Sequence, residues 1–126
     1  MEVPEGLRYT EDHEWLRQEG DLAVVGITAY AADELGDVVF VELPAVGRKV
    51  AAREVFGVIE SVKTASDLYC PVAGEIVEVN AGLGAAPELV NSDPHGEGWM
   101  IRIRPDDASA VDGLLDAAAY RALIGA

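Results

Sequence analysis

The residues that favour β-structure are arranged in short runs, each followed closely by a glycine, a proline or another turn residue. These runs span residues 21–28, 38–43, 55–60, 68–70, 74–79 and 99–104. Short strands separated by turns favour antiparallel pairing, because a tight hairpin can join neighbouring strands. With 126 residues, the chain is long enough to form a single domain, residues 1–126, around a real core. We therefore predict a mainly β protein, built as a flattened antiparallel barrel or sandwich with short helices.

Two helices are predicted beside these strands. Residues 29–35 are rich in alanine, which favours helix, and Thr28 can cap the start of this segment while Gly36 can end it. Near the C-terminus, residues 111–124 show the apolar spacing of an amphipathic helix. The apolar positions are Leu114, Leu115, Ala118, Leu123 and Ile124.

The net charge limits the kinds of molecule that this protein is expected to bind. The net charge is -14, from 23 acidic and 9 basic residues. Such a surface repels nucleic acid phosphates and anionic membrane, and it attracts partners that have basic docking faces. Alternatively, the acidic excess serves only to keep the protein soluble. We expect no nucleic acid and no membrane among the partners.

The expected location is the cytoplasm. Cys70 is the only cysteine, so no intramolecular disulfide can form, which fits a reducing compartment. The N-terminal residues are acidic and polar and lack the features of a signal or transit peptide. No apolar run approaches the roughly 20 residues that a membrane span needs.

Lysine is rare in this chain, and one lysine lies at a predicted turn. The chain has two lysines, Lys49 and Lys63, against seven arginines. Unlike arginine, lysine offers a primary amine that can be acylated. Lys63 lies between the predicted strands 55–60 and 68–70, where a modifying enzyme could reach it. Alternatively, a lysine at such a turn is simply solvated.

The sequence gives little support to an enzyme. It contains no Ser/His/Asp array, no phosphate-binding loop and no metal-ligand spacing of cysteines and histidines. His13 and His95 are far apart in sequence. Cys70 is expected to be a small packed residue rather than a nucleophile.

The segment from Gly57 to Val79, which includes Glu60, Lys63 and the pair Ser66-Asp67, resembles the lipoyl-acceptor hairpin of the glycine cleavage H protein family. The resemblance extends in order along nearly the whole chain. It includes the segments Tyr9–Trp15, Gly26–Ala31, Leu35–Pro44, Pro87–Pro94 and Gly98–Ile101. Two departures are His95, where the family often has tyrosine, and Cys70, where it often has a smaller residue. The resemblance implies the lipoyl-domain-like form of the β fold, a barrel-sandwich hybrid, with the lipoyl hairpin at about residues 57–79.

The resemblance implies that Lys63 carries lipoate through an amide bond to Nζ, and that the protein is a carrier rather than an enzyme. In this family the arm receives the aminomethyl group of glycine from a pyridoxal-phosphate glycine decarboxylase, the P protein. An aminomethyltransferase, the T protein, passes the one-carbon unit to tetrahydrofolate. Dihydrolipoamide dehydrogenase, the L protein, then reoxidises the arm. A separate lipoylating enzyme attaches the group, and a monomer is expected for a carrier that visits several enzymes.

The resemblance also gives roles to three acidic residues. Glu60 would help the lipoylating enzyme to recognise the hairpin; alternatively, it is a surface charge worth under about 1 kcal/mol. Glu14 and Asp67 would line a cleft that holds the loaded arm away from water, where a carboxylate could hold the cationic amine. Both are equally compatible with plain solvated acids.

Three other carriers compete with this interpretation. A biotin carrier would have methionine on both sides of its lysine, whereas Lys63 is flanked by Val62 and Thr64. Lipoyl domains of 2-oxoacid dehydrogenases lack the segment around Trp15 and the C-terminal helix. An H-like protein that relays lipoyl groups to other enzymes would have the same acceptor hairpin, so the sequence leaves that role open.

Overall fold

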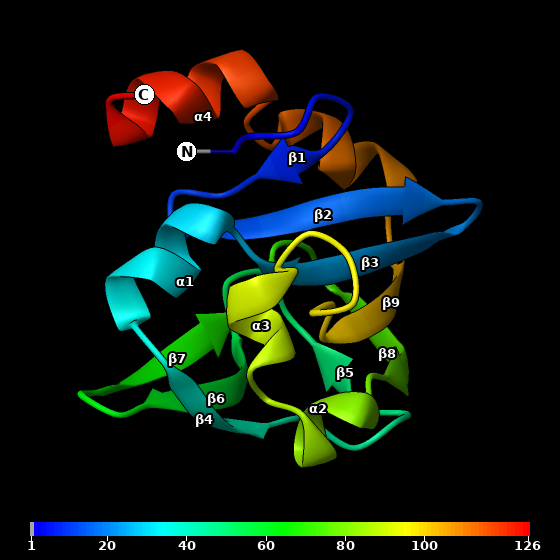
Figure 1. Ribbon diagram of the computed structural model, residues 1–126. Coiled ribbons are helices and arrows are strands. Elements are labelled where there is room, and N and C mark those ends of the chain that lie inside the picture. The colour runs from blue at the N-terminus through cyan, green and yellow to red at the C-terminus, as the bar shows by residue number, and fades with distance from the viewer. Residues whose placement is uncertain (1) are drawn as a thin grey trace.

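The computed structural model describes residues 2–126, which form two antiparallel sheets with short helices around them (Figure 1). The larger sheet has six strands, in the order β1 (Arg8–Tyr9), β2 (Glu14–Glu19), β3 (Leu22–Ile27), β9 (Ile101–Pro105), β8 (Gly74–Val79) and β5 (Lys49–Val50). The smaller sheet has three, in the order β4 (Val38–Glu42), β6 (Val55–Ser61) and β7 (Ala65–Tyr69). The helices are α1 (Ala29–Leu35), α2 (Gly82–Ala85), α3 (Leu89–Ser92), a 3-10 helix η1 (Ala108–Gly113) and α4 (Ala117–Ile124). No helix in this described part of the chain is long and apolar enough to cross a membrane.

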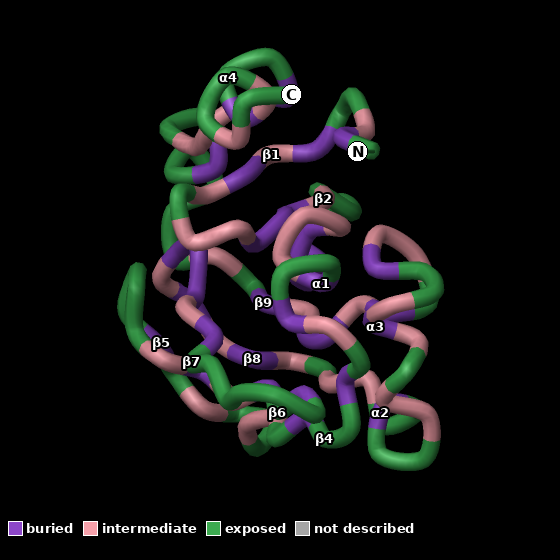
Figure 2. The backbone as a smooth tube through the Cα atoms, turned by 60° about the vertical axis from the view of Figure 1, so that its left-hand side comes forward, coloured by how far each residue is buried: buried purple, intermediate pink, exposed green. Residues whose placement is uncertain are grey.

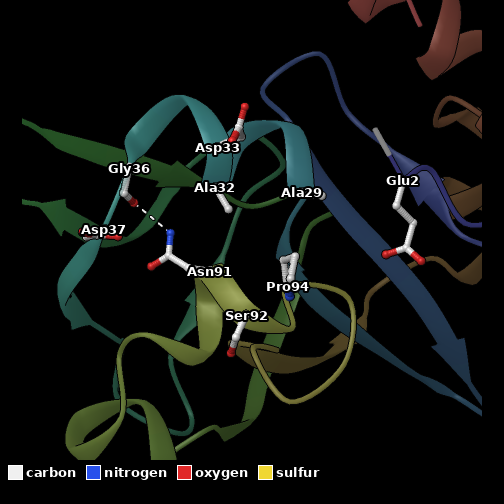
Figure 3. A pocket seen from close by; sticks show the side chains of 9 residues that line it. All are labelled: Glu2, Ala29, Ala32, Asp33, Gly36, Asp37, Asn91, Ser92 and Pro94. Atoms are coloured by element: carbon white, nitrogen blue, oxygen red, sulfur yellow. Dashed lines mark hydrogen bonds between the residues drawn. The ribbon is translucent and has the colours of Figure 1, made fainter.

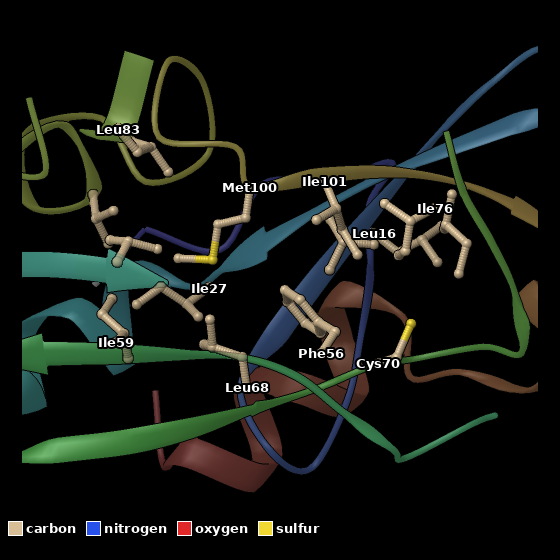
Figure 4. Packing of buried hydrophobic residues seen from close by; sticks show 14 of the residues in the cluster. Leu16, Ile27, Phe56, Ile59, Leu68, Cys70, Ile76, Leu83, Met100 and Ile101 are labelled. Atoms are coloured by element: carbon tan, nitrogen blue, oxygen red, sulfur yellow. The ribbon is translucent and has the colours of Figure 1, made fainter. Parts of the chain in front are cut away.

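The main core lies between the two sheets. Phe56 and Ile59 from β6 and Leu68 from β7 pack in one cluster with Leu16 from β2 and Ile101 from β9 (Figure 4). Each of these side chains is at most 2% exposed. Burying such large apolar side chains from both sheets is what holds the sheets face to face. The predicted class is confirmed, and the sheets form a flattened sandwich rather than a closed barrel.

A second core joins the C-terminal helix to the outer strands of the larger sheet. Tyr9 of β1 and Tyr120 of α4 stack with ring centroids 4.6 Å apart. Trp15 and Val24 belong to the same buried cluster. Three of the five residues are exposed in each of β4 and β7, the two outer strands of the smaller sheet, whereas β8 and β9 have one exposed residue each (Figure 2). The smaller sheet therefore forms an accessible end of the molecule.

Several predicted elements lie where the sequence places them. The strands β3, β4, β6 and β8 fall within two residues of their predicted bounds. The α1 caps follow the expected chemistry: Thr28 Oγ1 accepts a hydrogen bond from Ala31 N–H at 3.2 Å, and Gly36 ends the helix at a φ of 78°.

The predicted hairpin over 57–79 is too long. Strand β7 begins at Ala65, three residues before the predicted strand 68–70, because Glu60 already pairs with Ala65. The chain then crosses to the other sheet, where β8 pairs with β9 and β5. The hairpin is therefore β6 and β7 alone, with a short turn between Ser61 and Ala65.

The predicted helix over 111–124 is wrong in its first half. Residues 108–113 form the 3-10 helix η1, and α4 begins only at Ala117. Between the two, Leu115 is extended and exchanges two backbone hydrogen bonds with Tyr9, of 2.8 and 2.9 Å. Asp116 then caps α4 by accepting a bond from Ala119 N–H at 2.8 Å. The apolar spacing continues through this break, so periodicity alone cannot reveal it.

Candidate functional site

Lys63 lies at the tip of the β6–β7 hairpin, and Ser61 organises the turn that presents it. The Ser61 N–H donates to the carbonyl of Thr64 at 2.8 Å. The Ser61 Oγ accepts from the N–H groups of Lys63 and Thr64 at 3.3 and 3.2 Å. Such local bonds are typical of serine in turns, and they stand in for ladder bonds at the tip. Lys63 is exposed, while Ser61 beneath it is buried.

The tip of the hairpin is attached to the junction between α1 and β4. The Val62 N–H donates to the carbonyl of Asp37 at 3.0 Å. The Lys63 side chain passes over Gly36: a Cβ placed there would lie 3.4 Å from Lys63 Cε and 3.9 Å from Nζ. Lys63 enters none of the ion pairs found among residues 2–126. Among the described residues, the Lys63 amine therefore has no ion-pair partner that would compete with its modification.

Lys49 lies in a different setting. It is in the two-residue strand β5, opposite Glu75 of β8, and not at a turn. Lys63 thus lies at a turn, as predicted, whereas Lys49, which is also exposed, lies in a strand.

Glu60 and two large apolar side chains, Phe40 and Val62, are exposed on or beside the hairpin that carries Lys63. Glu60 is exposed and pairs with Phe40 on one side and Ala65 on the other. Phe40 is 50% exposed and Val62 is 70% exposed. Glu60 is therefore accessible to another protein that approaches Lys63.

A cavity of about 290 Å³ lies beside the hairpin and contains both predicted cleft residues, Glu14 and Asp67. One wall comes from the hairpin, a second from α1, and a third from the segment that leads into β2. The other residues that line it are Asp12, His13, Ile27, Tyr30, Ala31, Glu34, Leu35, Ile59, Ser66 and Leu68. The mixed lining offers apolar surface together with a few carboxylates, which suits a largely apolar arm with a cationic end.

Glu14 is deeply buried, at 2% exposure, and is therefore not a plain solvated acid. Its Oε1 accepts from the Thr10 hydroxyl at 2.7 Å, and its Oε2 accepts from the Tyr69 N–H at 3.4 Å. These two hydrogen bonds lower the pKa of Glu14, but burial has the larger effect and raises that pKa to about 8. A carboxyl group in this state is ready to accept a cation, because an opposite charge would compensate the cost of ionising it. Asp67, by contrast, is exposed at the edge of the cavity.

Tyr120 is a supporting residue that the sequence does not reveal. Its hydroxyl is hydrogen-bonded to Nδ1 of His13 and to Oγ1 of Thr28, at 2.8 Å in each case. His13 lines the cavity and has a φ of 68°, an unfavourable backbone conformation for a non-glycine residue. The contact spans 107 positions of sequence, and no local signal in the chain indicates it.

The side chains of the two histidines have different hydrogen-bond partners. His95 Nε2 accepts from the Ala29 N–H at 3.2 Å, and burial lowers the pKa of His95. His13 also has a lowered pKa because of burial. Within residues 2–126, no group of three or more His, Cys, Asp and Glu side chains is placed to hold a metal ion.

Cys70 is a packed residue, as expected. It is 1% exposed, and its thiol donates to the carbonyl of Val72 at 3.2 Å. Burial raises the pKa of the Cys70 thiol to about 12, so it carries little thiolate at neutral pH.

Comparisons with known proteins agree on one family. The family described as Glycine cleavage H-protein matches residues 7–126. A glycine cleavage system H protein from Bacteroides thetaiotaomicron is 58% identical over 124 residues, covering 98% of each chain. One from Chlorobium phaeobacteroides is 59% identical over 128 residues, covering 100% of each. The crystal structure of a glycine cleavage system H protein from Mycobacterium marinum matches with a TM-score of 0.90 and 43% identity, covering 98% of this chain and 100% of that one.

Proposed function

Because the chain belongs to the glycine cleavage H-protein family, we propose that Lys63 is the residue that carries its lipoyl group. The protein is the lipoyl carrier of the glycine cleavage system and has no catalytic activity of its own. Members of this family hold lipoate covalently. The biotin-carrier and lipoyl-relay alternatives are not favoured by these relationships. The carrier domain is proposed to extend over the whole of residues 1–126.

The position of Lys63 is the observation that carries the proposal. An acceptor lysine has to enter the active site of a modifying enzyme, so it must project beyond the surrounding surface. Lys63 is exposed at the end of a hairpin whose turn is fixed by Ser61, while Lys49 lies within a sheet strand. Both lysines are exposed, but only Lys63 lies at the tip of a hairpin, beyond the paired strands.

The residues near Lys63 fit a lipoyl arm. When attached, lipoate supplies a dithiolane that accepts the aminomethyl group of glycine and is later reoxidised. The amide bond converts the Lys63 ammonium into a neutral group, which suits a side chain that lies along Gly36 and forms no ion pair with the residues that the structure describes. The cavity of about 290 Å³ beside the hairpin offers a sheltered place for the far end of the arm.

Glu14 and Asp67 are proposed to hold the cationic amine of the cargo in that cavity. Glu14 is buried and forms none of the salt bridges found within residues 2–126, and the Thr10 hydroxyl would stabilise its ionised form. An ammonium group at this place would lower the pKa of Glu14, so a proton would leave as the cargo is bound. Asp67, at the edge, would add a weaker and more solvated attraction.

The proposed partners are the P, T and L proteins of the system and a lipoylating enzyme, met in the cytoplasm by a monomeric carrier. Val62 precedes Lys63 in the turn and Phe40 lies opposite Glu60 in the same sheet, and both are exposed; exposed large apolar residues of this kind favour a docking surface. Glu60 is proposed as a recognition residue for the lipoylating enzyme. The net charge of -14 would speed encounters with basic docking faces.

A reconstituted reaction tests the proposal. The parent chain, Lys63→Arg and Lys49→Arg are each treated with the lipoylating enzyme, lipoate and ATP. Each is then combined with the three partner enzymes, and release of carbon dioxide from glycine is measured. We expect the parent and Lys49→Arg to support release and Lys63→Arg to support none. Release with Lys63→Arg, or its loss with Lys49→Arg, would overturn the assignment of Lys63.

A further inference from the structure

A second cavity, of about 440 Å³, lies on the other side of α1, between that helix and α3. Its lining includes Gly36, Asp37 and Asn91, and Figure 3 shows the Asn91 amide pointing at the backbone of Gly36. This part of the structure has no role in the function described above. It nevertheless contacts the same segment, residues 36–38, that supports the lipoyl hairpin.

The side-chain amide of Asn91 makes two hydrogen bonds to that segment. Its Nδ2 donates to the carbonyl of Gly36 at 2.8 Å. Its Oδ1 accepts from the Val38 N–H at 2.9 Å. The two bonds lie on either side of Asp37, so one side chain from α3 fixes both flanks of the link between α1 and β4.

The same link contacts the lysine hairpin at two points. The Asp37 carbonyl accepts from the Val62 N–H at 3.0 Å, and the Lys63 stem lies over Gly36. Gly36 has a φ of 78°, a conformation that an unrestrained chain leaves easily once its bonds are lost. Asn91 therefore restrains the surface on which Lys63 lies, although it touches neither Val62 nor Lys63 in these bonds.

Restraining residues 36–38 affects how a lysine at the hairpin tip is presented. The tip of a hairpin has few tertiary contacts, so it opens locally at a lower free-energy cost than most of a domain. A modifying enzyme works only when the reacting amine is held close to one geometry, and small misplacements reduce its rate strongly. A residue that restrains residues 36–38 would therefore control how the amine is presented.

From this geometry we propose that Asn91 is a positioning residue for the lipoyl lysine: its amide fixes the 36–38 link, and that link fixes the tip that presents Lys63. The proposal rests on Lys63 being the attachment residue. It assigns to α3 a role in lipoylation through the backbone of residues 36–38 and not through contact with lipoate.

Asn80 provides a matched control for the test. Its Nδ2 donates to the carbonyls of Glu97 and Trp99 at 2.9 and 2.7 Å, and its Oδ1 accepts from the Gly82 N–H at 3.1 Å. Asn80 thus fixes a loop with the same kind of bonds but contacts neither residues 36–38 nor the hairpin in them. Asn91→Ala and Asn80→Ala should both lose stability, whereas only the first should disturb Lys63.

Two measurements are made on the full-length chain. Amide hydrogen exchange at Val62 is followed by NMR, and kcat and KM for lipoylation are measured with the lipoylating enzyme. We expect Val62 exchange in Asn91→Ala to be about fivefold faster or more, corresponding to loss of one net hydrogen bond, and lipoylation kcat/KM to fall by a similar factor. Asn80→Ala should match the parent in the rate of Val62 exchange and in kcat/KM for lipoylation. If Asn91→Ala does not fold, Asn91→Asp replaces it, because Asp keeps the acceptor for Val38 but loses the donor to Gly36.

The outcomes separate this inference from the assignment of Lys63. Unchanged Val62 exchange, or faster exchange with unchanged lipoylation, would overturn the role of Asn91 and leave Lys63 as the attachment site. Equal losses in Asn91→Ala and Asn80→Ala would also overturn it, because they would reflect general destabilisation. Lipoylation of Lys63→Arg at the parent rate would overturn the attachment site itself.

Discussion

Replacing Glu14 by glutamine should remove a large pH dependence from the stability of the fold. Glu14 is 2% exposed, and burial raises its pKa to about 8 from the ordinary value of 4.5. The nearby charges that act on it are weaker: Asp12 raises the pKa and Arg53 lowers it. Glutamine has nearly the same shape but no titrating proton, so the substitution isolates this one effect.

The sign follows from proton binding in the two states. Between pH 4.5 and about 8 the folded protein keeps a proton on Glu14 that the unfolded chain has released, so stability falls as the pH rises through this window. Each pH unit in this window lowers the free energy of unfolding by up to about 1.4 kcal/mol. From pH 6 to pH 9 the parent should therefore lose about 2 to 3 kcal/mol more than Glu14→Gln, with the loss levelling off above about pH 8.

The assay is urea unfolding at pH 6, 7.5 and 9, followed by tryptophan fluorescence, since Trp15 is fully buried. The lowered pKa values of His13 and His95 affect parent and variant alike and cancel in the difference. Glu60→Gln, at an exposed position, is the matched control and should run parallel to the parent. If Glu14→Gln also runs parallel to the parent, Glu14 is ionised normally and the argument from burial is refuted.

Three further predictions concern other residues. Glu60→Gln should slow lipoylation in vitro while leaving stability unchanged, and equal lipoylation rates would rule out recognition through this carboxylate. Tyr120→Phe keeps the aromatic stack but loses the bonds to His13 and Thr28, so it should cost about 1 to 3 kcal/mol in urea unfolding, and no loss would show that these bonds contribute nothing net. The Cys70 thiol, 1% exposed with a pKa of about 12, should react with an aromatic disulfide reagent at pH 8 only after unfolding; rapid reaction of the native protein would contradict its burial.

The features that could be predicted from sequence are those set by neighbouring residues. The caps of α1 depend on Thr28 and Gly36, which lie within one turn of the helix that they delimit. The placement of Lys63 between β6 and β7 likewise follows from two adjacent β-rich runs. The role of Ser61 in the turn could also have been predicted, because a serine just before a turn often forms hydrogen bonds to the backbone of that turn.

The features that could not be predicted depend on residues far apart in the chain. The C-terminal helix breaks because Leu115 pairs with Tyr9, and apolar spacing alone gives no sign of that pairing. The burial of Glu14 depends on how the hairpin and α1 close over the start of β2, so the sequence left it equally compatible with a solvated acid. Asn91 reaches residues 36–38 across more than fifty positions and carries no local signal of this contact.

The most direct test of the carrier function is peptide-level mass spectrometry after treatment with a lipoylating enzyme, lipoate and ATP. We expect one lipoyl adduct, on the peptide that contains Lys63, and none in Lys63→Arg. Lys49→Arg should be modified like the parent. An adduct on Lys49, or no adduct on the parent chain, would contradict the presentation of Lys63 by the β6–β7 hairpin.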